Sequence, residues 1–172
     1  MQYRRNYVKG GSYFFTVNLL DRNKSLLVEH IDLLRESIRV VKSQRPFYID
    51  AWVVLPDHLH AVLTLPDNDT DYSGRWREIK KRFSKSLPKT EFLTQTRKRK
   101  NERGIWQRRF WEHTIRDDND YWHHVNYVHF NPLKHGLVSR VVDWPYSSFH
   151  RAVKQGIYTS NWCGEKIHII KT

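Results

Sequence analysis

Two strand-like runs separated by a single Pro-Asp pair constrain the fold of this chain more than any other feature. Residues 48–55 (Tyr-Ile-Asp-Ala-Trp-Val-Val-Leu) and 58–65 (His-Leu-His-Ala-Val-Leu-Thr-Leu) are rich in β-branched and aromatic side chains, as strands usually are. Pro56 and Asp57 between them are typical of a tight turn. The two runs therefore predict an antiparallel hairpin, around which the other elements must be arranged.

The segments on either side of the hairpin predict further strands and helices. In chain order we expect a strand at 13–19, an amphipathic helix at 28–41, the hairpin, a helix at 73–87, a strand at 112–116, and a helix from about 117 that Pro132 should kink or end. This order predicts an α+β fold, a ferredoxin-like βαββαβ antiparallel sheet with helices on one face. A C-terminal helix carrying Tyr127 and an irregular tail would follow.

Length and composition limit the domain organisation. A chain of 172 residues suggests one domain, which we expect to span 1–150 with a charged, mobile loop at 88–104, followed by a tail at 151–172. The sequence has no run of 18 apolar residues, so no membrane span is expected. Cys163 is the only cysteine, which excludes a disulfide framework and fits a cytoplasmic protein.

The positive charge is concentrated in one stretch. Of the 30 Lys and Arg residues, 15 lie between 75 and 116 beside only four acids, so this stretch carries most of the net charge of +12. A charge of this size implies an anionic partner. Aromatic residues among the basic ones, such as Trp76 and Trp111, suit phosphates with stacked, unpaired bases, although most of them are more simply explained as core residues.

The hairpin contains half of a candidate metal site. His58 and His60 are two residues apart in a predicted strand, so their imidazoles point to the same face. On spacing alone, a pair that is solvated or satisfied in the core is the default interpretation. A catalytic metal needs a third ligand and open positions for water or substrate.

The last predicted helix supplies a candidate nucleophile and a third ligand. Tyr127 and Asn131 are four residues apart and share a helix face. A phenol is mostly protonated at neutral pH, so attack on phosphorus would need the metal or a cation such as Lys134. Two imidazole nitrogens and an amide oxygen would suit Mg²⁺ or Mn²⁺, while the histidine pair would also accept Zn²⁺. Taken alone, Tyr127 could be a structural tyrosine and Asn131 a helix terminator.

Other tyrosine and histidine side chains near this helix have simpler explanations. Tyr121 lies six residues before Tyr127, on a nearly opposite face, and is expected in the core or at the surface. We interpret the remaining histidines of the region as DNA contacts or structural hydrogen-bonding groups: His113, His123, His124 and His135.

Several motifs together resemble one family. They are Trp-Val-Val-Leu-Pro-Asp-His-Leu-His at 52–60, Phe-Trp-Glu-His-Thr-Ile-Arg at 110–116, Tyr-Val-His-Phe-Asn-Pro-Leu-Lys-His-Gly at 127–136 and Trp-Pro-Tyr-Ser-Ser at 144–148. In this order, over roughly residues 3–150, the chain resembles the REP-associated tyrosine transposases. These form a branch of the Y1 (IS200-like) transposase family of His-hydrophobic-His (HUH) nucleases.

The resemblance implies a reaction and a substrate. His58 and His60 match the metal-binding histidines, Tyr127 matches the nucleophile, and Asn131 lies where the family has a polar third ligand. The implied reaction cuts single-stranded DNA beside a palindromic hairpin, forms a 5′-phosphotyrosine and then joins strands. With the basic stretch and the N-terminal segment, this predicts DNA contacts at Tyr3, Arg4, Arg5, Lys9, Arg75, Arg77, Lys80, Lys81, Arg108, Arg109 and Lys134.

Other functions remain open from the sequence. The main alternative is a non-catalytic hairpin-binding protein or repressor on the same scaffold. A replication initiator or relaxase would use the same histidine pair, and a single-strand RNA binder would explain the charge without needing it. We expect a monomer acting in cis without an obligate protein partner, with a dimer that exchanges tyrosine helices as the alternative.

Overall fold

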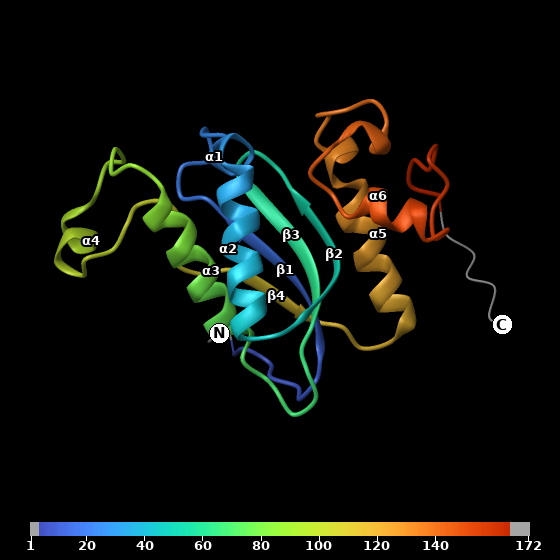
Figure 1. The fold of residues 1–172 in the computed structure, drawn as a ribbon, viewed down its shortest axis with the longest axis horizontal. Helices are drawn as coiled ribbons and strands as arrows, with labels where there is room; N and C mark the ends of the chain where they lie inside the picture. The colour runs from blue at the N-terminus through green and yellow to red at the C-terminus, as the bar shows by residue number, and fades with distance from the viewer. Residues whose placement is uncertain (1–3, 166–172) are drawn as a thin grey trace.

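The computed structural model describes residues 4–165 and is built on a four-stranded antiparallel sheet (Figure 1). The strands are β1 (Ser12–Asn18), β2 (Tyr48–Val54), β3 (His58–Thr64) and β4 (Trp111–Thr114). Their order across the sheet is β2-β3-β1-β4, and β2 and β3 form the predicted hairpin. This order, with helices between β1 and β2 and between β3 and β4, confirms the ferredoxin-like prediction.

One face of the sheet packs against three helices, of which the second and third correspond to the helices predicted at 28–41 and 73–87. These are α1 (Leu26–Glu29), α2 (Ile31–Gln44) and α3 (Tyr72–Ser86). Phe15 and Leu59 point from the strands into this core, where they meet residues such as Leu34 of α2. The Asp71 side chain caps α3 by accepting a hydrogen bond from Gly74 N at 2.8 Å.

The other face of the sheet is covered by α5 (Asp118–Lys134), which carries Tyr127 (Figure 1). Val125 and Val128 pack there against Phe14 and Val62 of the strands. The helix continues for two residues beyond Pro132, so the proline lies inside α5 and does not end it. None of the described helices is long and apolar enough to cross a membrane.

A buried hydrogen-bond chain ties α5 to the sheet and to the C-terminal segment. Tyr158 Oη donates to Asn126 Oδ1 at 2.8 Å, so its oxygen is left to accept from Nδ1 of His129 at 2.9 Å. Ser148 Oγ lies 2.7 Å from His129 Nε2 and accepts from Trp52 N of β2 at 2.9 Å. Burial lowers the pKa of His129 to about 3, which keeps the ring in the neutral form that this chain of bonds requires.

The segment after α5 is irregular but packed. It contains a short 3₁₀ turn, η1 (Val141–Asp143), and α6 (Phe149–Lys154). Tyr158 and Trp162 lie beyond these elements and pack with Phe149 and Val141 in a third apolar cluster beside α5. The aromatic residues of the tail therefore bury themselves against the tyrosine helix, although they have no regular periodicity.

The segment 88–104 differs from the featureless loop that its charge predicts. It contains α4 (Gln95–Arg99), and Arg97 inside α4 is buried. The Arg97 guanidinium donates to Arg103 O at 2.6 Å, and Arg103 in turn donates to Ser84 O at 2.6 Å at the end of α3. Two of the basic residues therefore fasten the segment, so its Lys and Arg residues do not all face solvent.

Candidate active site

His58 and His60 lie on β3, one of the two central strands, and face α5. They pair with Asn18 and Thr16 of β1, so their side chains share the face that also carries Phe14. The two rings lie 4.9 Å apart between centroids, and both side chains are buried. Because β3 is hydrogen-bonded on both edges, the backbone holds the two imidazoles in fixed positions.

Neighbouring polar groups orient both rings through Nδ1. The Asp57 carboxylate lies 2.8 Å from His58 Nδ1 and is itself bound by Arg22. Thr16 Oγ1 lies 2.8 Å from His60 Nδ1. If each Nδ1 donates its proton to these oxygens, the Nε2 lone pairs are free for a ligand, as is usual for metal-binding histidines.

The electrostatics of the pair favour neutral imidazoles. Burial, followed by the neighbouring His58, lowers the pKa of His60 to about 3. Burial also lowers the pKa of His58, although its hydrogen bond to the Asp57 carboxylate partly opposes this. Neutral rings retain the lone pair that a metal ion needs.

The sequence did not single out these orienting residues. An aspartate directly before the first histidine was a signal, but its role as a turn residue was sufficient to explain it. Thr16 could have been found only by aligning β1 with β3, and Arg22 lies in a loop without a motif.

One stripe of α5 and its C-terminal end faces the histidine pair. The Tyr127 ring lies 5.4 Å from the His60 ring, and the His135 ring lies 5.3 Å from the His58 ring. Asn131 lies one helical turn from each of these two residues, on the same side. It is fully buried, and its side-chain oxygen and nitrogen have no hydrogen-bond partner among the described residues.

These unpaired atoms fit a divalent cation. His60 Nε2 is also buried and without a hydrogen-bond partner in the described part of the chain. A buried polar group left unpaired costs about 1–3 kcal/mol, so several of them around one helix–strand contact need an explanation. Two imidazole nitrogens and an amide oxygen would satisfy a divalent ion and leave positions for a phosphate.

A second group of potential ligands is less suited to a metal ion. The ligand atoms of His113, Asp120 and His124 lie within 4.8 Å of one another. However, His113 Nε2 already lies 2.8 Å from the Asp120 carboxylate, and His124 Nδ1 lies 2.8 Å from Asp120 O. The two rings are stacked at 20°, so no nearby point lies in both ring planes. We interpret this group as a brace between β4 and the start of α5.

Tyr127 has a cation beside its phenol. Lys134 Nζ donates to Tyr127 Oη at 3.1 Å and lies 4.7 Å from the ring centroid. This contact exists because α5 stays helical past Pro132. Tyr121 differs, because its hydroxyl donates to Asp50 Oδ1 at 2.9 Å, and burial together with Asp50 raises its pKa. The Tyr121 hydroxyl is therefore used in a hydrogen bond to the sheet, whereas the Tyr127 ring lies beside His60.

The predicted DNA contacts fall into separate groups. Tyr3 lies outside the described residues. Arg5 stacks on the Phe110 ring at 3.9 Å, and Lys80 Nζ donates to Gln107 O at 2.8 Å, with burial lowering the pKa of Lys80 to about 8. The exposed members of the set are Arg4, Lys9, Arg77, Lys81, Arg108, Arg109 and Lys134.

Arg75 is a correction to the predicted contacts. Its side chain is 2% exposed and donates to Arg45 O, Pro46 O and Asp71 O, and to the Asp69 carboxylate at 2.8 Å. The bonds to Arg45 O and Pro46 O fasten the start of α3 to the end of α2, and those to Asp69 and Asp71 hold the segment that leads into α3. The guanidinium is therefore not available to a DNA phosphate.

Removing this guanidinium should destabilise the fold. We expect Arg75→Met to lower the free energy of unfolding by about 2–4 kcal/mol, because buried carbonyl groups and Asp69 lose their donors. The matched control is Arg77→Met, two residues along the same helix and exposed, which should change it by less than about 0.5 kcal/mol. Urea unfolding measures both, and equally small effects would contradict the structural role.

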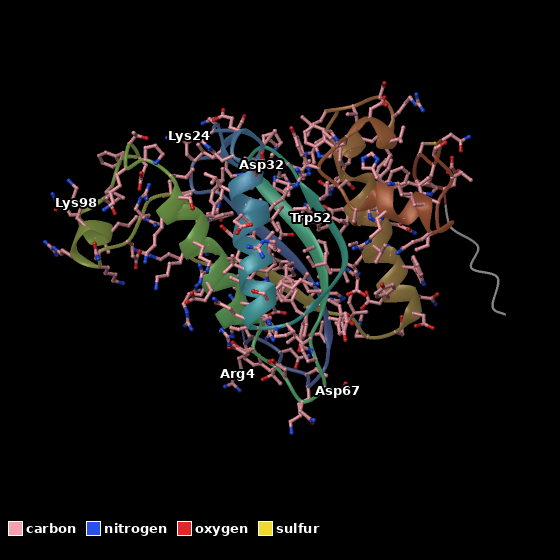
Figure 2. All side chains as sticks on the ribbon, viewed as in Figure 1. Arg4, Lys24, Asp32, Trp52, Asp67 and Lys98 are labelled. Carbon is pink, nitrogen blue, oxygen red and sulfur yellow. The ribbon has the colours of Figure 1, made fainter. Side chains whose placement is uncertain are left out.

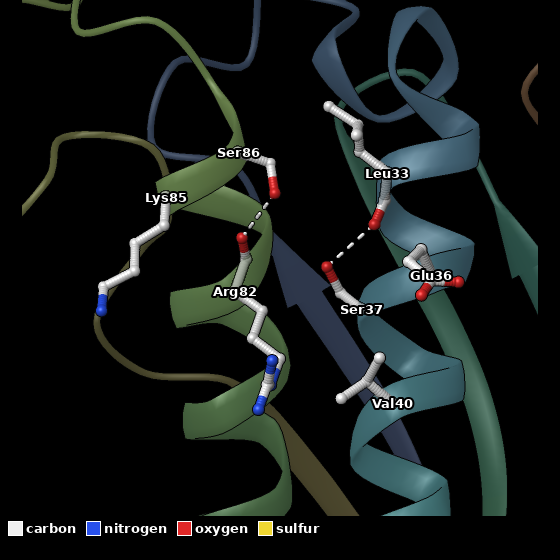
Figure 3. Close-up of a pocket in the computed structure, with 7 residues that line it drawn as sticks. All are labelled: Leu33, Glu36, Ser37, Val40, Arg82, Lys85 and Ser86. Atoms are coloured by element: carbon white, nitrogen blue, oxygen red, sulfur yellow. Dashed lines mark hydrogen bonds between the residues drawn. The ribbon is translucent and has the colours of Figure 1, made fainter.

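A groove of about 360 Å³ between α2 and α3 carries no comparable chemistry (Figure 3). Its two hydroxyl groups are bound within their own helices, Ser37 Oγ to Leu33 O at 2.8 Å and Ser86 Oγ to Arg82 O at 2.9 Å (Figure 3). It lies on the face of the sheet opposite to His60. We interpret it as a seam between two helices.

Comparison with known proteins agrees with this geometry. Residues 8–131 match the family described as "Transposase IS200 like". The chain is 50% identical to the REP-associated tyrosine transposase of Escherichia coli (strain K12), over 95% of this chain and 92% of that protein. A protein of Haemophilus influenzae is 48% identical over 94% of this chain and 93% of its own length. The solved structure of a REP-associated tyrosine transposase bound to a REP hairpin is 47% identical, with a TM-score of 0.83 over 98% of this chain and 99% of that chain.

Proposed function

The chain belongs to the IS200-like transposase family, in its REP-associated tyrosine transposase branch, and from this premise we propose that Tyr127 is its nucleophile and that His58, His60 and Asn131 hold a divalent cation. As a member of this branch it nicks and joins single-stranded DNA. One observation carries the site assignment: the Tyr127 ring packs against His60, while buried polar atoms of His60 and of Asn131, one helical turn from Tyr127, have no hydrogen-bond partner among the described residues.

The proposed cleavage step uses the phenol of Tyr127. Its oxygen attacks a DNA phosphorus while its proton leaves to water. The bond from phosphorus to the 3′ oxygen breaks, and that oxygen takes a proton and leaves as a 3′-OH. The 5′ phosphate is then joined to Tyr127, and attack by a 3′-OH reverses the step and joins strands. When bound, a divalent ion, which we propose to be Mg²⁺ or Mn²⁺, polarises the phosphate.

The residues around Tyr127 support this step. Lys134 donates to the phenol oxygen at 3.1 Å and would stabilise the phenolate as its proton leaves. The Phe14 and Tyr127 rings pack at a steep angle with 5.7 Å between centroids, and Phe14 also stacks on His60. The ring is therefore held beside the histidines by packing from the sheet.

We propose that the DNA partner is a hairpin with adjoining single strand and that one copy of the chain is sufficient. The relative whose structure contains a REP hairpin supports the first part. The second is supported by α5, because it packs on its own sheet and brings Tyr127 to His60 of the same chain. Light scattering behind size exclusion, with and without hairpin DNA, tests the monomer.

Covalent trapping tests the proposed reaction. The protein is mixed with end-labelled single-stranded DNA that contains a hairpin, with Mg²⁺ or Mn²⁺, and run on a denaturing gel. We expect a protein–DNA adduct that needs both the hairpin and the metal. Hairpin binding without an adduct, across a library of sequences beside the stem, would favour the alternative of a recognition protein or repressor.

Asp57 should act as a positioning residue for the metal site. We expect Asp57→Asn to weaken Mn²⁺ binding by about 10–100-fold, because His58 loses the carboxylate that orients its ring. Electron paramagnetic resonance of free Mn²⁺ measures the affinity without DNA. The control is Asp67→Asn, an exposed aspartate at the other end of the hairpin (Figure 2). If both variants bound Mn²⁺ like the wild type, Asp57 would have no role at the metal.

A further inference from the structure

Phe92 is presented to solvent on the segment between α3 and α4. Its side chain is 86% exposed, the highest value among the exposed large hydrophobic residues of 4–165. A single exposed apolar residue is ordinary on a protein surface, so the exposure of Phe92 carries weight only together with the way its backbone is held and the charges around it. Neither the fold nor the proposed active site uses it.

The backbone around Phe92 is firmly held. The preceding Glu91 carboxylate is paired with Arg103 at 3.0 Å and accepts from Gly104 N at 3.3 Å. Arg103 also donates to Pro88 O at 3.0 Å, on the other side of the segment. Gly104 packs so closely that an added Cβ would lie 2.9 Å from Phe92 O. These contacts hold the backbone on both sides of Phe92, while the Phe92 ring faces solvent.

The surroundings of Phe92 are strongly cationic. Segment 88–104 contains six Lys and Arg residues against two acids, Glu91 and Glu102. Both acids are paired with arginines, Glu91 with Arg103 and Glu102 with Arg108 at 3.0 Å. The exposed cations of the segment are Lys89, Lys98, Arg99 and Lys100.

A basic groove continues from this segment along α3. Arg77, Lys81 and Lys85 are exposed and four residues apart, so they form one stripe about 12 Å long on the helix. They line a groove of about 610 Å³, with Arg108 among the other residues that line it. This surface suits a phosphate backbone, because each cation can neutralise a phosphate.

The aromatic tip and the proposed active site lie in different parts of the molecule. The segment with α4 is at one end of the long axis, with Lys98 pointing outward, and α5 is on the other side of the sheet (Figures 1 and 2). A ligand that reaches both must be extended. A DNA hairpin with a single-stranded arm has this form.

We propose that Phe92 stacks on an unpaired base of the DNA hairpin, whose stem lies in the basic groove of α3. This inference rests on the proposed function and adds a second contact region to it. Aromatic stacking needs a base that is not already covered by a neighbouring pair, so the apical loop is the part of the hairpin that it would select.

Fluorescence anisotropy with a DNA hairpin tests this contact. We expect Phe92→Ala to raise the hairpin Kd by about 5- to 100-fold, the usual effect of losing one stacked base. Phe92→Trp should retain the affinity. The matched control is Tyr48→Ala, which removes another exposed aromatic ring, 66% exposed, from the start of β2. With 2-aminopurine in the loop, wild-type protein should quench the fluorescence and Phe92→Ala should not.

The outcomes separate this inference from the function on which it rests. Wild-type protein that binds no hairpin would overturn both. Tight wild-type binding that Phe92→Ala leaves unchanged would overturn only the stacking contact. Quenching of 2-aminopurine in the stem, with none in the loop, would overturn the choice of the loop.

Discussion

Tyr127→Phe is expected to abolish the covalent protein–DNA adduct and to lower cleavage by at least about 10³-fold, while hairpin binding stays within about threefold of wild type. The substitution removes one oxygen atom, the proposed nucleophile. The ring remains, so its packing against Phe14 and His60 is retained. The exposed basic surface is unchanged and continues to supply most of the affinity.

Tyr121→Phe is the matched control for this result. It removes the same atom from the same helix, but that hydroxyl is bonded to Asp50 on the sheet. We expect it to lower stability by about 1 kcal/mol and to leave the adduct intact. An adduct that persists in Tyr127→Phe but disappears in Tyr121→Phe would reverse the assignment.

Much of the fold was predictable because its signals are local. The Pro-Asp turn between two β-branched runs predicts the hairpin, and the apolar spacing over 28–41 predicts α2. The alternation of side chains along β3 is enough to place His58 and His60 on one face. These inferences depend only on neighbours in the sequence.

The position of α5 was not predictable in the same way. Its core-facing residues Val125 and Val128 do not say which face of the sheet they meet. That choice depends on contacts across long separations, such as the hydrogen bonds that link His129 to Ser148 and Tyr158. The distance between the proposed nucleophile and the proposed metal ligands is therefore a property of the folded chain.

Charge was the least reliable signal. Arg75 and Arg77 are equivalent in the sequence, yet one is enclosed by backbone carbonyls and the other faces solvent. Arg97 and Arg103 similarly organise the loop that their charge predicted to be featureless. A guanidinium has five donors and can satisfy several carbonyls at a turn, which composition cannot distinguish from phosphate binding.

Substitutions at the proposed metal site are expected to separate DNA binding from DNA cleavage most directly. We expect His58→Ala to lower cleavage by more than 100-fold, beyond the effect of losing an orienting residue such as Asp57. Hairpin affinity should change little, because His58 is buried and most of the exposed cations proposed to contact DNA belong to other segments of the chain. Mn²⁺ binding, measured without DNA, should fall with the activity.

Two further variants keep this result interpretable. His58→Gln leaves a side chain in the buried position and guards against a loss of activity that only reflects a cavity. His123→Ala removes an exposed histidine of α5 that is outside the proposed ligand set, and it should behave as wild type. If His58→Ala lost hairpin binding and cleavage to the same extent while remaining folded, the histidine would belong to the DNA-binding surface. The metal would then have to be sought at another group, and the cluster of His113, Asp120 and His124 would be the first to test.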